Sequence, residues 1–214
     1  MTTELSGVLL ARHGETNDNL LPGRFQGWTD TPLNDTGRRQ AFELATRLSQ
    51  RTDSPATCPE RGIRGTGRGI RGQADTGEPR IASLWSSDLS RARETASIVG
   101  AALGLRPLQD WRLREGYRGR WEGYLFDDIR ESEPDHFAAW LRGGASFRFP
   151  GGESLLEQQQ RVTASLRDIQ AHGPLPALAV CHGGSIRVML AEHDPRGLDA
   201  FHDFTVPNVT MLSL

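Results

Sequence analysis

Short apolar runs alternate with helical periods along this chain, and this alternation is the feature that most limits its possible folds. The first run is VLLAR at residues 8–12, and two others, IASLWSS at 81–87 and ALAVCHGG at 177–184, follow it. Each run leads into a stretch with apolar residues three and four positions apart, which is typical of an amphipathic helix. Strands alternating with helices predict an α/β fold, a three-layer αβα sandwich with a mostly parallel central sheet and helices on both faces.

The expected helices carry start signals and continuous apolar faces. Asn34 is the predicted N-cap of the first helix, and Ser154 with Glu157 matches the S-x-x-E capping box ahead of the third long run. A last apolar run at residues 209–214 predicts a closing strand. The residues expected on the buried helix faces are Ala41, Leu44, Ala45, Leu48, Ala92, Thr95, Ala96, Val99, Val162, Leu166 and Ile169.

Length and charge exclude several classes of protein. The chain has 214 residues, 36% of them apolar, with a formal net charge of -2, which favours one domain with one substantial core. Its 25 basic and 27 acidic side chains create no overall field for nucleic acid or membrane, so neither is expected as a partner. The N-terminal residues lack the pattern of a signal peptide and no run reaches the roughly 18 apolar residues of a spanning helix, so we expect a cytoplasmic protein.

A Gly/Arg-rich segment at about residues 51–79 differs from the rest of the chain. It contains RGIRG twice, and its glycines and prolines cannot form a core. Such a segment is either an RG-rich contact for nucleic acid or a flexible surface insertion. We favour the insertion because acidic residues interrupt the segment and it has no aromatic side chain for base stacking. Since it joins the end of a helix to the next strand, we expect it at the edge of the sheet opposite the site described next.

Charged and polar residues follow the carboxyl ends of the three main predicted strands, where ligands gather in a parallel α/β sheet. A single arginine or histidine is usually a surface or capping residue, but convergence at one edge favours a function. Guanidinium groups and loop or helix-terminal N–H groups match the oxygens of phosphate, so the set predicts a pocket for a small tetrahedral dianion. The residues concerned are Arg12, His13, Asn19, Arg91, His182 and Gly183.

Six motifs in order resemble the signature of the histidine phosphatase superfamily, phosphoglycerate mutase-like branch. They are RHGET with GWTDTPLNDTGRRQA, SSDLSRARETA, LREGYRGRWEG, FPGGES, CHGGSIR and VPNVT. The resemblance covers nearly the whole chain and implies one histidine phosphatase domain over residues 1–214. Only the insertion at about residues 51–79 falls outside it.

This resemblance implies a role for each matching residue. His13 takes the place of the nucleophile that forms a phosphohistidine, and Glu115 takes the place of the general acid and base. A metal-free site without a cofactor is expected, because no H-x-x-H or H-E-x-x-H spacing occurs and the arginines would repel a cation. The residues implied to hold the phosphoryl group are Arg12, Arg91 and His182, assisted by Asn19, Arg24, Gln26, Gly27 and Gly183.

The glutamate motif contains a rival carboxylate and a departure from the family pattern. Glu122 is the alternative acid/base, although we expect it to be a structural partner and prefer Glu115. The family usually has an apolar residue after the glutamate and Phe two positions later, whereas this chain has Gly116 and Arg118. This change leaves Glu115 in place and predicts altered packing around it. Cys181 and His182 are not expected to form a catalytic dyad, because adjacent residues on a strand point to opposite faces.

We therefore expect a metal-independent phosphomonoesterase that hydrolyses a small phosphorylated metabolite through a phosphohistidine. The alternatives are phosphoryl transfer between hydroxyls, as in a phosphoglycerate mutase, and a non-catalytic phosphate-binding protein. Hydrolysis is favoured because the short segment at residues 123–151 has no Arg-Arg pair or Pro-rich cover to shield a phosphoenzyme. The aromatic residues of the same segment either wall a leaving-group pocket or belong to the core. They are Tyr124, Phe126, Phe137, Trp140 and Phe147.

Overall fold

The strands form a single sheet in which the first strand lies next to the fourth. The computed structural model of the protein describes residues 5–20, 22–50 and 80–213. The strand order is β3-β2-β4-β1-β5, and all pairs are parallel except β1 with β5. This mostly parallel sheet confirms the fold class predicted from the sequence. The strands are β1 (Val8–Arg12), β2 (Ser83–Ser86), β3 (Leu108–Gln109), β4 (Ala177–Cys181) and β5 (Met211–Ser213).

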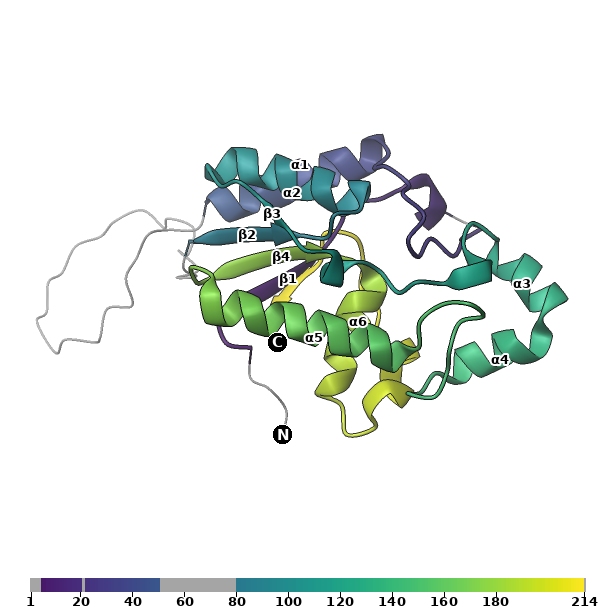
Figure 1. Cartoon of the computed structure of the whole chain (residues 1–214). Helices are drawn as coiled ribbons and strands as arrows, with labels where there is room; N and C mark the ends of the chain where they lie inside the picture. The colour runs from purple at the N-terminus through teal and green to yellow at the C-terminus, as the bar shows by residue number, and fades with distance from the viewer. Residues whose placement is uncertain (1–4, 21, 51–79, 214) are drawn as a thin grey trace, which may run out of the picture.

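Helices cover both faces of the sheet, which gives the three predicted layers (Figure 1). One face is covered by α1 (Asp35–Ser49) and α2 (Ser90–Leu103), and the other by α5 (Leu155–His172) and α6 (Gly183–Glu192). Two further helices, α3 (Phe126–Ser132) and α4 (Pro134–Arg142), lie together to one side of the sheet. In the described part of the chain, no helix has both the length and the apolar character needed to cross a bilayer. Short 3-10 helices are formed by Asn17–Asn19, Trp111–Leu113, Gly119–Trp121 and Gly197–Asp203.

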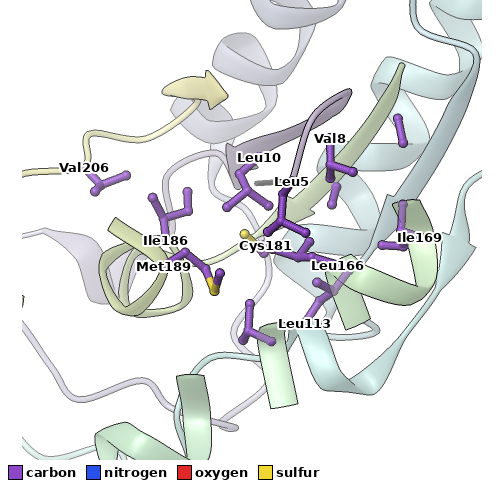
Figure 2. Close-up of a cluster of buried hydrophobic side chains, with 13 residues drawn as sticks. Leu5, Val8, Leu10, Leu113, Leu166, Ile169, Cys181, Ile186, Met189 and Val206 are labelled. Atoms are coloured by element: carbon purple, nitrogen blue, oxygen red, sulfur yellow. The ribbon is translucent and has the colours of Figure 1, made fainter. Parts of the chain in front are cut away.

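Alternate side chains of the central strands pack into two hydrophobic clusters, one on each face of the sheet. Val8 and Leu10 of β1 belong to a cluster with Leu166 of α5 and Ile186 of α6 (Figure 2). Their neighbour Ala11 points to the opposite face and belongs to the cluster formed with α1 and α2. Because successive side chains of a strand point to opposite faces, the sheet packs against a helical layer on each side.

The helix starts agree with the sequence signals. The side chain of Asn34 accepts a hydrogen bond from the Gly37 amide at 2.8 Å, as expected of an N-cap. Ser154 and Glu157 form the capping box, with Ser154 Oγ accepting from the Glu157 amide and a Glu157 oxygen accepting from the Ser154 amide. The second strand is shorter than the run at residues 81–87. The Gly/Arg-rich segment at residues 51–79 lies outside the described residues, so its expected position stays a prediction.

Two glycines let the loop after β1 press against the start of α1. A Cβ atom on Gly14 would lie 2.3 Å from the carbonyl oxygen of Gly37, and one on Gly37 would lie 2.1 Å from the carbonyl oxygen of Glu15. No real side chain tolerates such distances to backbone atoms. The glycine of the RHG motif therefore fixes how closely the loop that follows His13 approaches the first helix.

We expect Gly37→Ala to destabilise the protein by about 2 kcal/mol or more, because overpacking against a backbone carbonyl forces the loop away from the helix. Urea unfolding followed by circular dichroism measures the change. Thr46→Ala, on the exposed side of the same helix, is the control and should cost less than about 0.5 kcal/mol. Equal stabilities for the Gly37→Ala and control variants would contradict the close approach.

Candidate active site

A cavity of about 260 Å³ lies where the chain leaves β1 and enters α6. Nine of the ten residues that the sequence assigns to the site line this cavity, and the tenth, His182, does not. The prediction that residues after separate strands would meet at one edge therefore agrees with the geometry. The nine are Arg12, His13, Asn19, Arg24, Gln26, Gly27, Arg91, Glu115 and Gly183.

His13 is held in one tautomer at the wall of the cavity. Its Nδ1 lies 2.6 Å from the carbonyl oxygen of Gly14, and a carbonyl only accepts hydrogen bonds, so Nδ1 carries the proton. Burial lowers the pKa of His13 well below its ordinary value, and the nearby charges of Arg91 and Arg12 lower it further. The ring is therefore neutral near pH 7, with Nε2 unprotonated. An unprotonated, oriented imidazole nitrogen is what nucleophilic attack requires.

His182 packs against His13 and is completely buried. The two ring centroids are 5.1 Å apart in an edge-on arrangement. Neither ring nitrogen of His182 has a hydrogen-bond partner among the described residues. Burial, followed by the charge of Arg91, lowers its pKa well below the ordinary value, so this ring is also neutral. An unpaired polar ring at this depth is costly unless a ligand or water supplies a partner.

Arg12 and Arg91 are guanidinium groups that backbone carbonyls hold in place. The Arg91 side chain donates to the carbonyl oxygens of Thr29 and Gly27, each at 2.8 Å, while Nε has no partner in the described structure. Burial lowers the pKa of Arg91 to about 10, so the group is still charged at neutral pH. Arg12 donates to the carbonyl of Val206 and likewise has an unpaired Nε. Neither cation has a carboxylate ion-pair partner among the described residues, so both can bind an anion.

Glu115 is the best-coordinated carboxylate of the site. Its Oε2 accepts from the Gly184 amide at 2.8 Å, and Oε1 accepts from the Gly116 amide at 3.0 Å and from Gln158 at 2.9 Å. Arg118 Nη2 lies 3.3 Å from the same Oε1. Burial alone would raise the pKa of Glu115, but Arg118 and these donors outweigh it and lower the pKa to about 2. Glu115 is therefore a carboxylate in the free site.

Glu122 has a different environment. Its Oε1 accepts from the amides of Trp28 and Arg118, at 2.7 Å and 3.1 Å, and it does not line the cavity. These bonds fix the loop whose carbonyls at Gly27 and Thr29 hold Arg91. Glu115 thus lines the cavity while Glu122 anchors the loop that holds Arg91, and the choice of Glu115 as the acid/base stays a prediction.

The secondary phosphate-binding candidates are partly engaged with their own neighbours. Asn19 Oδ1 accepts from the Thr16 amide at 3.0 Å, and Gln26 donates to the Thr16 hydroxyl at 2.7 Å. Arg24 is exposed and donates to the carbonyl of Gly123. Gly27 contributes the carbonyl that holds Arg91, so its role here is to orient a cation.

The C-terminal segment braces the end of β1, at Arg12 and His13. Asn208 donates to the His13 carbonyl at 2.9 Å, and the Val209 amide donates to the Arg12 carbonyl at 3.1 Å. Val209 has φ of 52°, a costly backbone conformation for a β-branched residue. In the sequence, VPNVT was recognisable only as part of a family pattern, and no role for Asn208 was expected.

Two further arginines of the cavity, the buried Arg118 and the half-buried Arg187, were not assigned to the site from the sequence. Both line the cavity, and the Nε of Arg187 has no partner among the described residues. The available signal was helical spacing, because Arg187 follows Gly183 by four residues and so shares its face of α6. Of the aromatic candidates, Phe126 and Trp140 line the cavity, whereas Phe137 and Phe147 belong to a third hydrophobic cluster. Tyr124 is exposed and does not line the cavity.

The cavity carries an excess of positive charge. Five arginines and two carboxylates line it, so the ionised side chains leave a net charge of about +3 for a ligand to neutralise. Within residues 5–20, 22–50 and 80–213, no three His, Cys, Asp or Glu side chains are grouped as a metal site would need. Burial raises the pKa of Cys181 to about 12, so this thiol stays protonated. The chemistry that these groups support is anion binding beside a neutral imidazole. The arginines are Arg12, Arg24, Arg91, Arg118 and Arg187, and the carboxylates are Asp18 and Glu115.

Comparison with known proteins identifies relatives over most of the chain. Residues 8–76 and 71–214 match the family model for the histidine phosphatase superfamily, branch 1. Phosphoglycerate mutase-like protein 4 of Arabidopsis thaliana is 32% identical over 191 residues, which are 88% of this chain and 71% of that protein. Probable phosphoglycerate mutase GpmB of Escherichia coli is 35% identical over 179 residues, 82% of this chain and 69% of that protein.

Solved structures with the same fold include proteins described as phosphatases. A mycobacterial glucosyl-3-phosphoglycerate phosphatase in complex with VO3 superposes with a TM-score of 0.74 at 27% identity, covering 95% of this chain and 88% of that one. YhfR of Bacillus stearothermophilus also gives a TM-score of 0.74, at 28% identity, covering 95% of this chain and 89% of the other.

We expect both His13 and His182 to stay neutral at pH values below the ordinary histidine pKa of about 6.5. A lowered pKa means that the imidazole takes up its proton only at a pH well below the ordinary value of about 6.5. Nitrogen-15 NMR of the imidazole rings measures the protonation state directly, and His13→Ala and His182→Ala variants assign the signals. A titration of either ring near pH 6.5 would contradict the buried, neutral pair.

Proposed function

The chain belongs to branch 1 of the histidine phosphatase superfamily, whose members are phosphatases or mutases, and on that premise we propose that it is a phosphomonoesterase. The proposed substrate is a small phosphorylated metabolite, and the proposed route is a phosphohistidine on His13 in a single domain without a metal or cofactor. One observation carries the proposal: unpaired buried donors of His182, Arg12 and Arg91 surround a neutral, oriented imidazole.

In the first step, Nε2 of His13 attacks phosphorus, and the bond to the leaving oxygen breaks with its electron pair going to that oxygen. The ring becomes positive, and the Gly14 carbonyl that accepts from Nδ1 stabilises this charge. Arg12, Arg91 and His182 are suited to hold the three equatorial oxygens. Because Glu115 begins as a carboxylate, the proton for the leaving oxygen enters with the substrate monoanion, whose second pKa is about 6.

In the second step, water attacks the phosphohistidine and Glu115 accepts the proton that the water loses. The phosphorus–nitrogen bond breaks, the electron pair returns to Nε2, and inorganic phosphate leaves. A single carboxyl group can serve both steps because it gives a proton to the leaving oxygen in the first step and takes one from water in the second. A mycobacterial relative at 26% identity has been solved with inorganic phosphate bound, which supports this product for the present site.

Hydrolysis is favoured over phosphoryl transfer between hydroxyls. Relatives described as mutases and relatives described as phosphatases both resemble this chain, so the names alone do not decide. The segment at residues 123–151 contains α3 and α4 and contributes Phe126 and Trp140 to the cavity wall. It lacks the basic pair that would bind a substrate carboxylate, and this difference supports water as the acceptor.

We expect turnover of p-nitrophenyl phosphate in the presence of EDTA, with a phosphohistidine that His13→Ala abolishes. Loss of the nucleophile removes the two-step route, so the rate should fall by about three orders of magnitude or more. The exposed His136 on α4 provides the control, and His136→Ala should keep the wild-type rate. Isomerisation of 3-phosphoglycerate faster than its hydrolysis would favour the mutase instead. Phosphate binding without turnover would favour the non-catalytic alternative.

We expect Glu115→Gln to slow the hydrolysis of glycerol phosphate at least about tenfold more than that of p-nitrophenyl phosphate. An alkoxide needs a proton as it departs, whereas p-nitrophenolate leaves readily without one. Steady-state rates of the wild type and the variant on both substrates give the ratio, with Glu122→Gln as the comparison. If both substrates slowed equally, Glu115 would be only a structural residue.

A further inference from the structure

Arg118 is a buried cation at the base of the cavity. The residue is only 8% exposed, and its guanidinium lies 4.3 Å from the centroid of the Phe149 ring. Among the described residues, Glu115 is its ion-pair partner, at 3.3 Å, and Nη1 has no hydrogen-bond partner. A buried charge is strongly unfavourable without a partner, so the position of Arg118 depends on Glu115.

Two glycines leave the space that the Arg118 guanidinium occupies. A Cβ atom on Gly116 would lie 2.8 Å from Nη1, and one on Gly184 would lie 2.8 Å from Nη2. The two residues that depart from the family pattern, Gly116 and Arg118, therefore belong to one arrangement. The small residue makes room for the large cation.

Arg118 contacts Oε1 of Glu115, the same oxygen that accepts hydrogen bonds from Gln158 and from the Gly116 amide. Several other charged or titratable groups face the carboxylate from the elements packed around it. Among the described arginines and histidines, Arg118 is the one whose side-chain nitrogen lies within 4.0 Å of a Glu115 carboxylate oxygen. These groups are Arg12 of β1 and His13 after it, Arg91 of α2, Cys181 of β4 and Arg187 of α6.

We propose that Arg118 is a positioning residue for Glu115: it fixes the orientation of the carboxylate and keeps it charged, so that Glu115 starts each half-reaction as a proton acceptor. The catalytic effect of Arg118 rests on the proposed phosphatase function. Glu115 accepts a proton from the substrate monoanion and passes it to the leaving oxygen, then accepts one from water. Substrates whose leaving group departs as a stable anion are the least affected by this bias.

The sign of the effect follows from the charge. A positive group within about 4 Å of a carboxylate favours the ionised form, and its removal raises the carboxylate pKa by about one to three units. Arg118→Met therefore should raise the pKa of Glu115 above its present value of about 2, and the burial of the site should add to the rise. Arg118→Gln, which can keep a hydrogen bond but not the charge, should have the same direction of effect. Arg118→Lys should keep the pKa low.

Carbon-13 NMR of the glutamate carboxyl groups in the full chain measures this pKa without depending on any activity. Glu115→Gln identifies the Glu115 signal by its disappearance. The matched control is Arg114→Met, because Arg114 also lies over an aromatic ring, Trp28 at 4.7 Å, and also pairs with a carboxylate, Asp88 at 2.7 Å. In the control the titration of Glu115 should stay unchanged.

Kinetics provide the second readout. In Arg118→Met the rate on glycerol phosphate relative to p-nitrophenyl phosphate at pH 7 should rise by up to about tenfold for each unit of pKa, as the protonated fraction of Glu115 increases. Combining Arg118→Met with Glu115→Gln should remove this change, because Arg118 acts through Glu115. A purely structural role of Arg118 would lower both rates together in either background.

The two proposals fail in different ways. A Glu115 pKa that stays near 2 in folded Arg118→Met or Arg118→Gln protein would overturn the role of Arg118, whatever the enzyme does. Absence of wild-type hydrolysis of any phosphomonoester would reject the phosphatase and leave the NMR result to decide the pairing. Thermal unfolding of each variant verifies that it is folded, and the glutamine variant serves if the methionine variant is not.

Discussion

The excess of buried positive charge around Glu115 is the constraint on which the rest of the site depends. Arg12, Arg91, Arg118 and Arg187 all face this one cavity, and burial lowers the pKa of each. Such a cluster costs free energy in the folded protein because the cations repel one another and have lost water. A bound phosphoryl dianion supplies the missing charge and the missing hydrogen-bond acceptors. Binding of an anion therefore relieves the repulsion and desolvation of these arginines, which favours the bound state.

Backbone carbonyls hold two of these cations, Arg12 and Arg91. Carbonyls of the loop at Gly27 and Thr29 orient Arg91, and Glu122 in turn anchors that loop through the Trp28 amide. On the other side, the strained residue Val209 follows Asn208, which holds the His13 carbonyl. Carbonyl acceptors fix a guanidinium without neutralising it, so the charge stays available for a ligand.

The sequence predicted what depends on topology and missed what depends on packing. Residues after parallel strands meet at one edge, so Arg12, His13 and Arg91 could be placed together without a structure. Arg187 could have been added from its helical spacing to Gly183, but Arg118 could not, since an arginine is normally exposed and nothing in its local pattern indicates burial. The space that Gly116 and Gly184 leave for Arg118 appears only when distant segments are packed. The aromatic residues divide between cavity and core for the same reason.

The pairing of Glu115 with Arg118 also bears on the second half of the reaction. A charged carboxylate is a poor proton donor in the first half of the reaction but a ready proton acceptor in the second. The group that accepts the phosphoryl must lose a proton there whether it is water or a hydroxyl of a mutase substrate, so an ionised Glu115 serves either route. The choice between the two routes therefore depends on which acceptor reaches the cavity, whose wall includes Phe126 of α3 and Trp140 of α4.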